Sequence, residues 1–93
     1  MVHVKQPKHL PGAEFVPRIF QLFELKRRYL LIGEISLDTQ YRLEVVEWQL
    51  EELVHAGKLR RLTAEEKKPF GLHSLTVAYV KTTLRVSAVI FTS

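Results

Sequence analysis

The spacing of apolar residues predicts a helix in the first third of the chain. From Arg18, apolar side chains recur at intervals of three and four residues as far as about Arg28, which is typical of a helix with one apolar face. Pro17 precedes this stretch, where its missing N–H costs a helix nothing. The next apolar run meets Gly33, a residue type that commonly ends helices. We therefore expect a first main helix over residues 18–28.

A short extended segment is expected next. Residues 34–37 alternate between polar and apolar side chains, which predicts that Ile35 and Leu37 point inward. Asp38 and Thr39 are both good N-cap residues, so a helix is expected to begin close to them. The pattern leaves open whether residues 38–42 form a separate short helix or the first turn of a longer one.

A second main helix is expected in the middle of the chain. It is predicted to extend to Ala56, with Gly57 as its C-terminal stop and the basic Lys58 beyond it. On a helical wheel its apolar residues fall on one stripe. The expected core face consists of Leu43, Val46, Leu50, Leu53 and Val54.

The last third of the chain predicts strands. Residues 58–62 favour one strand, and a polar loop over residues 63–74 follows it. Residues 75–80 and 84–91 are rich in Val, Thr and Ile, which favours two more strands. We therefore expect an α+β fold in which two main helices pack on a small antiparallel sheet.

The length of 93 residues and the 46% hydrophobic content fit a single globular domain, which we place at residues 18–93. Residues 1–17, with three prolines, are expected to form a flexible basic arm. The chain has no cysteine, which excludes disulfides and thiol catalysis and fits a cytoplasmic location. No stretch is long and uncharged enough for a membrane span, so we expect no membrane partner.

Charge is sorted along the chain. Residues 1–28 hold six Lys/Arg against two Glu, residues 29–56 hold one Arg against six acids, and residues 57–93 hold seven Lys/Arg against two Glu. The net charge of +4 is therefore the sum of +4, −5 and +5. The acidic part contains the second main helix. One face of that helix gathers Glu44, Glu47, Glu51 and His55, with Trp48 and Glu52 at its far edge.

The order of these elements resembles a winged helix-turn-helix domain. A helix, the segment Glu34-Ile35-Ser36-Leu37, a second helix and the run Val54-His55-Ala56-Gly57-Lys58-Leu59-Arg60-Arg61-Leu62 follow the pattern of such domains. The chain looks most like the small ferrous-iron-transport regulators of the FeoC-like type, and also like the winged-helix ends of proteasome-lid-type scaffold subunits. The resemblance implies that the segment from Glu34 is the strand before helix two. It also implies that residues 57–62 form the first wing strand.

The resemblance implies a non-catalytic regulator that binds DNA, but its recognition helix would be acidic. Phosphates repel carboxylates, so that helix is a poor reader of the major groove. We therefore place DNA binding of low sequence specificity on the basic wing and arm. The candidate residues are Lys26, Arg27, Arg28, Lys58, Arg60, Arg61, Lys67 and Lys68.

Two alternatives to DNA binding are kept. In the first, the protein is an interaction adaptor that docks a basic partner on Glu44, Glu47, Trp48, Glu51 and His55. In the second, it is a self-associating structural subunit that forms a homodimer through the apolar C-terminal strand. The four histidines are widely scattered and the glycines are isolated, so we expect no catalytic site, no metal and no cofactor.

Overall fold

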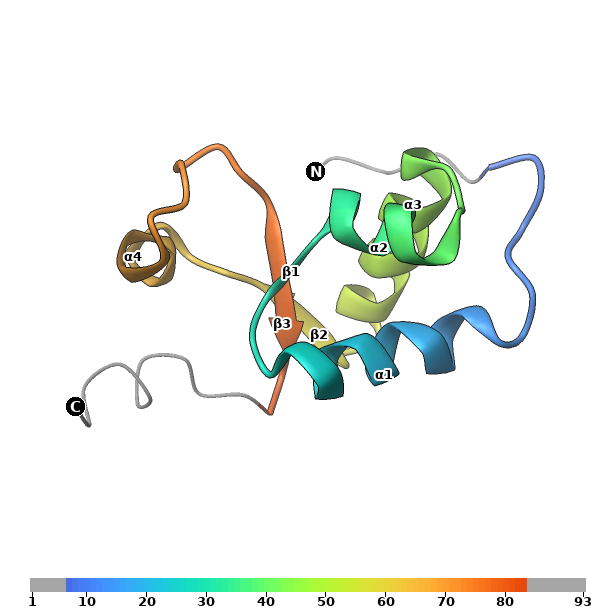
Figure 1. The fold of residues 1–93 in the computed structure, drawn as a ribbon, viewed down its shortest axis with the longest axis horizontal. Coiled ribbons are helices and arrows are strands. Elements are labelled where there is room, and N and C mark those ends of the chain that lie inside the picture. The colour runs from blue at the N-terminus through green and yellow to red at the C-terminus, as the bar shows by residue number, and fades with distance from the viewer. Residues whose placement is uncertain (1–6, 84–93) are drawn as a thin grey trace.

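A computed structural model of the chain describes residues 7–83 (Figure 1). The predicted strand over residues 84–91, and with it the predicted C-terminal dimer contact, lies outside the described residues. The elements are α1 (Phe15–Lys26), β1 (Leu30–Leu31), α2 (Ile32–Thr39), α3 (Leu43–His55), β2 (Leu59–Arg61), α4 (Ala64–Lys67), a 3₁₀-helix (Lys68–Phe70) and β3 (Ala78–Lys81).

The three strands form one antiparallel sheet in the order β1-β3-β2. Leu30 of β1 lies opposite Tyr79 of β3, and Arg60 of β2 lies opposite Val80. β3 is therefore the central strand, and helices α1, α2 and α3 lie together beside the sheet (Figure 1). The α+β fold of winged-helix type predicted from the sequence is confirmed, with α2 as a helix beyond the two that were expected.

Helix α1 begins at Phe15, three residues before the predicted start at Arg18. Pro17 occupies its first turn, where no intrahelical N–H bond is lost. Arg27 ends the helix in the left-handed conformation, with φ of 54°, and its N–H donates to the Phe23 carbonyl at 2.8 Å. The expected stop at Gly33 is wrong, because the chain has already turned at Arg27 and Gly33 lies inside α2.

The predicted extended segment over residues 34–37 is wrong, because these residues form the middle of α2. A helix as short as α2 shows fewer than three turns, so its sequence resembles strand alternation. Ile35 is fully buried as expected, but Leu37 is 85% exposed on the opposite side of the helix. The strand before helix two is β1, and not the segment from Glu34 that the resemblance implied.

Helix α3 ends at His55, one residue before the predicted end at Ala56, and Gly57 follows in the left-handed conformation at φ of 77°. Val46, Leu50 and Leu53 are buried, as the helical wheel predicted. The prediction that Leu43 lies in the core is wrong, because Leu43 is 58% exposed. Val45, which was not predicted to be in the core, is buried and borders the apolar face on the side opposite Leu43. The main core joins the helices to the sheet and consists of Phe15, Ile19, Leu22, Phe23, Leu30, Ile35, Val45, Val46, Leu50, Leu53, Leu59 and Tyr79.

The wing connects β2 to β3 and contains α4 and the 3₁₀-helix, where a polar loop was predicted. Thr63 caps α4: its hydroxyl accepts from the Glu66 N–H at 3.2 Å, and the Glu66 carboxylate accepts from the Thr63 N–H at 2.9 Å. This reciprocal capping box stabilises a helix that is too short to form alone.

Candidate functional site

Helix α3 occupies the place of a recognition helix, and its exposed face is acidic. Glu44, Glu47, Glu52 and His55 are exposed there, and Trp48 is partly buried among them. No lysine or arginine lies between residues 43 and 57. Glu47 forms no ion pair within residues 7–83, and Glu44 meets only the exposed Arg42, at 3.8 Å. The carboxylates on this face are therefore available to a partner.

Glu51 does not belong to this exposed face, contrary to the sequence prediction. Its side chain is only 10% exposed and accepts hydrogen bonds from Arg61 Nε at 3.0 Å and from the Tyr79 hydroxyl at 2.5 Å. Arg61 donates to the second carboxylate oxygen as well. Burial and the neighbouring Glu51 carboxylate raise the pKa of Tyr79 above its usual value. Glu51 thus joins α3 to β2 and β3 and is a structural residue.

The arginines of the first wing strand are engaged within the protein. Arg61 is held by Glu51, as described, and Arg60 donates to both carboxylate oxygens of Glu66, at 2.7 and 2.8 Å. The hydrogen bonds from Arg60, together with the Thr63 N–H, lower the pKa of Glu66 to about 2. Phosphate binding at Arg60 or Arg61 would have to compete with these two-pronged ion pairs.

The two wing lysines differ. Lys67 is buried, and its Nζ donates to the Ser74 carbonyl at 2.8 Å, so it closes the wing loop and does not face solvent. Lys68 is exposed and lies 3.4 Å from the exposed carboxylate of Glu65. Of the two, only Lys68 is placed to meet a nucleic acid phosphate.

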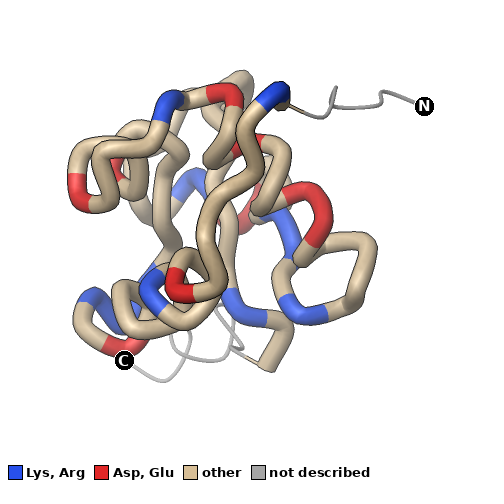
Figure 2. The backbone as a smooth tube through the Cα atoms, turned by 90° about the vertical axis from the view of Figure 1, so that its right-hand side faces the viewer, with Lys and Arg blue, Asp and Glu red and all other residues tan. Residues whose placement is uncertain are grey.

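Among the basic residues at the end of α1, Arg28 is engaged within the protein, whereas Lys26 and Arg27 are exposed. Arg28 donates to the Tyr29 carbonyl at 2.7 Å and to Glu34 at 2.6 Å, and it lies 4.6 Å from the Tyr29 ring centre. Lys26 and Arg27 are exposed, as is Lys58 at the start of the wing. Figure 2 shows Lys and Arg interspersed with Asp and Glu along the backbone, and not gathered on one side.

A groove of about 820 Å³ adjoins the acidic face of α3. Residues 7–10 of the arm form one side, and Glu44, Val45 and Glu47 form the other. The Gly12 N–H donates to the Tyr41 hydroxyl at 3.2 Å, and the rings of Phe15 and Tyr41 lie 4.5 Å apart. These contacts hold the arm against the turn between α2 and α3.

Sequence reasoning missed two features of these surfaces. The first is Arg42, 86% exposed, which lines the groove together with Lys8. The second is the Arg60–Glu66 pair, and here a signal was present, because Thr63 and Glu66 have the spacing of a capping box. Glu52, which the sequence placed at the edge of the acidic face, is exposed and lies 3.9 Å from His55.

No group of three His, Asp or Glu side chains that could hold a metal ion is present in residues 7–83. Within the same range, no helix is both long and apolar enough to cross a membrane. Comparison of the chain with protein-family models, with curated proteins and with solved structures gave no match.

Proposed function

We propose that this protein is a winged-helix interaction module that docks a basic segment of a partner protein on the exposed face of α3. The observation that carries the proposal is that the carboxylates of α3 are exposed, whereas the arginines of the wing strand are paired within the protein. Glu44, Glu47 and Glu52 are exposed at the position of a recognition helix, whereas Arg60 and Arg61 of the wing are paired internally. A carboxylate-lined helix attracts lysine and arginine side chains and repels phosphates.

Trp48 gives the docking face a large aromatic residue. Partly buried aromatic side chains bordered by charges are common anchors in protein interfaces. The groove beside residues 7–10 adjoins this face; Glu44 and Glu47 line one part of it, and Lys8 and Arg42 line another. We therefore expect the basic segment to lie along Glu44 and Glu47 and not to fill the whole groove. The interaction expected from these features is salt-sensitive, because exposed ion pairs weaken as ionic strength rises.

The experiment uses Trp48, which is the single tryptophan of the chain, as a reporter at the site. Titration with a synthetic Lys/Arg-rich peptide is expected to change its fluorescence and to saturate at low salt. Glu47→Lys should weaken binding by about tenfold, because an attraction becomes a repulsion across the interface. The matched control is Glu65→Lys, which reverses another exposed carboxylate, on α4, and should leave the titration unchanged.

DNA binding remains the second candidate, and a specific observation favours it. Lys26, Arg27, Lys58 and Lys68 are exposed, so they can contact phosphates without breaking the internal pairs of Arg28, Arg60 and Arg61. Titration of a fluorescent random-sequence duplex across a salt series separates the two functions. Tight duplex binding that Lys58→Glu and Lys68→Glu abolish, together with no response to the peptide, would contradict the interaction module and favour DNA.

A further inference from the structure

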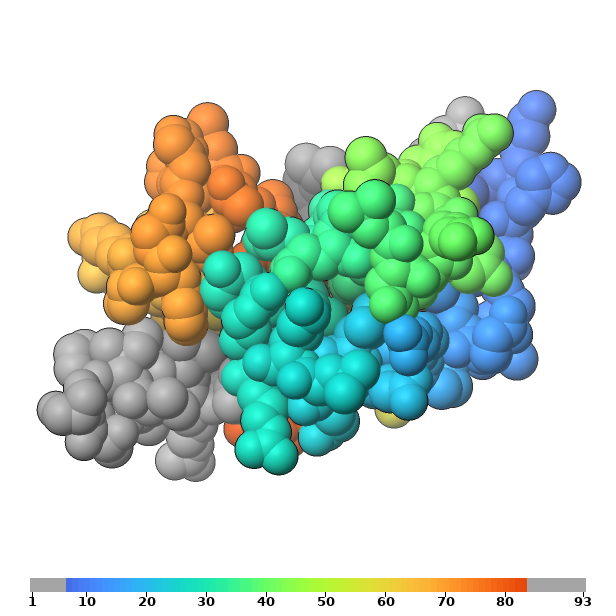
Figure 3. All heavy atoms as spheres, in the orientation of Figure 1, coloured from blue at the N-terminus to red at the C-terminus, as the bar shows by residue number. Residues whose placement is uncertain are grey.

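The N-terminal arm is anchored beside the acidic face of α3. The Gly12 N–H donates to the Tyr41 hydroxyl at 3.2 Å, and the Phe15 ring packs on the Tyr41 ring. Residues 7–10 then line the groove that adjoins α3. In the space-filling view the arm, in blue, lies at the same end of the molecule as the start of α3 (Figure 3). The chain that precedes Pro7 therefore joins the described structure at the edge of the docking face.

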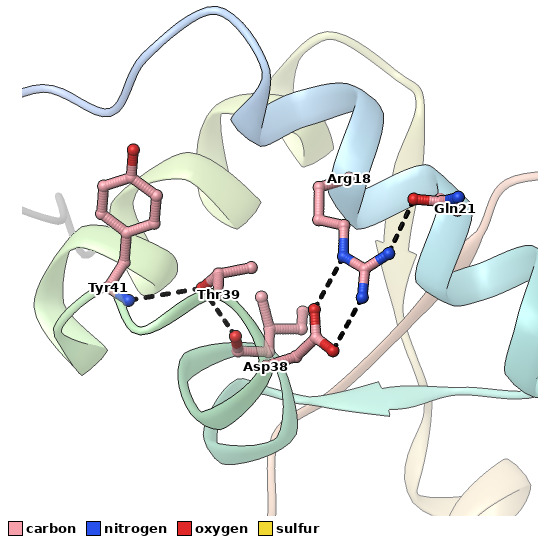
Figure 4. Close-up of polar contacts among 6 residues, drawn as sticks. Arg18, Gln21, Asp38, Thr39 and Tyr41 are labelled. Carbon is pink, nitrogen blue, oxygen red and sulfur yellow. Dashed lines mark hydrogen bonds and ion pairs between the residues drawn. The ribbon is translucent and has the colours of Figure 1, made fainter.

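The turn that holds the arm is itself fixed to the helices. The Tyr41 N–H donates to Thr39 Oγ1 at 3.4 Å, and the Thr39 hydroxyl donates to the Ile35 carbonyl at 2.7 Å (Figure 4). Asp38, one residue earlier, accepts two hydrogen bonds from Arg18 of α1, at 2.8 and 2.9 Å. Because these contacts join α1, α2 and the turn, the anchor of the arm has a defined position relative to α3.

The arm and the face of α3 carry opposite charge. The first 13 residues contain Lys5 and Lys8 and no Asp or Glu. Lys8 is exposed, lines the groove and forms no ion pair within residues 7–83. Glu47, also on the groove, is exposed and has no ion-pair partner in the same residues, whereas Glu44 lies 3.8 Å from Arg42. Glu47 is therefore the carboxylate on the groove that is open to a cation from the arm.

The six residues before Pro7 are long enough to cover the docking face. Six residues of extended chain span at most about 20 Å. The exposed carboxylates of α3 are spread over about 12 Å at the rise of an α-helix. Lys5 is two residues from Pro7 and has the apolar Val4 beside it. This segment thus offers a cation for Glu47 and an apolar side chain for the partly buried Trp48.

We propose that residues 1–6, together with Lys8, bind the exposed face of α3 in the same chain and compete there with the basic partner. This inference rests on the proposed function, because the arm occupies the face on which the partner docks. A tethered segment acts at a high effective concentration, so weak ion pairs are enough to occupy the face for part of the time. A partner segment must displace the arm, which favours segments with several cations over those with one.

The first experiment follows the arm without any partner. Nuclear magnetic resonance spectra of the labelled full chain are compared at low and high salt at about pH 7.5, where most histidines are neutral. Salt should weaken the ion pairs of the arm and shift the amide signals around Trp48 in the wild type. The double variant Lys5→Gln/Lys8→Gln should lose most of this response. The control, Lys26→Gln/Lys68→Gln, makes the same change in net charge away from the groove and should respond like the wild type.

The second experiment measures competition with the Lys/Arg-rich peptide, again through Trp48 fluorescence. Lys5→Gln/Lys8→Gln should bind the peptide about three- to tenfold more tightly than the wild type, because the competing cations are gone. Lys26→Gln/Lys68→Gln should change the affinity by less than about twofold, since charges far from the site are screened. Equal gains in affinity for the two double variants would overturn the proposal, because net charge alone would then explain them.

The two experiments separate failure of the arm from failure of the proposed function. If the wild type and Lys5→Gln/Lys8→Gln respond alike to salt and bind the peptide equally well, the proposal for the arm is overturned and the docking face stands. If the salt response depends on Lys5 and Lys8 but no variant binds the peptide, the arm contacts α3 as proposed and the docking of a basic partner is contradicted. Loss of both the salt response and peptide binding in every variant would overturn both.

Discussion

The exposed face of α3 and the wing carry opposite charge, but they differ more in how that charge is used. In the wing, Arg60 is paired with Glu66 and Arg61 with Glu51. On α3, Glu47 has no partner within residues 7–83, and Glu44 meets only the exposed Arg42. The two arginines of β2 are thus engaged within the protein, whereas Glu44 and Glu47 of α3 stay exposed to water.

The sign of a charged segment therefore does not show whether its charge is available to a partner. The sequence has a basic C-terminal third, and this favoured DNA binding through the wing. In the fold, acids from α3 and α4 reach back to the wing arginines and neutralise them. In the acidic middle of the chain, Glu51 is therefore engaged in the core, and the exposed carboxylates on α3 are those of Glu44, Glu47 and Glu52.

The largest effect on stability is expected for Glu51, the buried carboxylate of α3. Glu51→Ala should lower the free energy of unfolding by about 2–3 kcal/mol, because it removes a charged hydrogen-bond acceptor and leaves the Tyr79 hydroxyl unpaired in the core. Chemical denaturation measures the loss. Glu47→Ala, one turn away on the same helix, is the control and should change stability by less than about 0.5 kcal/mol. Equal effects would contradict the division between the two residues.

A smaller, pH-dependent effect is expected for the pair between β2 and α4. Glu66→Gln should cost about 1 kcal/mol at neutral pH, since the substitution keeps an acceptor for the Thr63 N–H but removes the charge that binds Arg60. The pKa of Glu66 is lowered from 4.5 to about 2, so this stabilisation is present above about pH 4.5 and is lost as the pH falls toward 2.

Denaturation of the wild type and Glu66→Gln at several pH values checks this. The difference between them should be constant near neutrality and should narrow below pH 4.5. Glu65→Gln provides the control, since Glu65 is exposed and meets only Lys68 among the described residues 7–83. A difference that is independent of pH would mean that the carboxylate charge does not stabilise the wing.

The smallest expected effect on stability is on the docking face itself. Glu44→Gln and Glu47→Gln together should change the free energy of unfolding by less than about 0.5 kcal/mol, because both side chains are exposed. The same pair should clearly weaken binding of the Lys/Arg-rich peptide. Thermal denaturation and the Trp48 titration, measured on the same samples, separate the two effects. A large loss of stability would show that these residues are structural, like Glu51.

The sequence predicted the parts of the fold that have long periods or strong stop signals. Helix α3 has more than three turns and is followed by Gly57, so its core stripe and its end, to within one residue, could be predicted. Helix α2 was missed because eight residues show little period, and because Arg27 and Gln40 adopt the left-handed turns that glycine usually makes. Leu37 was consequently assigned to the wrong side.

The candidate site was harder to predict than the fold. Whether Glu51 faces water depends on β2 and β3, which place Arg61 and Tyr79 beside it from positions 10 and 28 residues away. No regular spacing in the sequence indicates that Glu51 contacts Arg61 and Tyr79. The Arg60–Glu66 pair is local, and the Thr63-x-x-Glu66 spacing indicates the capping helix that brings the two side chains together.

We infer that α3 offers its charge to a partner, whereas Arg60 and Arg61 of the wing do not. The direct test is nuclear magnetic resonance of the labelled protein, with backbone shifts followed during titration of a Lys/Arg-rich peptide and, separately, of a random-sequence duplex. We predict that the peptide shifts residues of α3 around Glu44, Glu47 and Trp48, and that the duplex causes little change. Shifts at Lys26, Lys58 and Lys68 with the duplex, and none on α3 with the peptide, would contradict it.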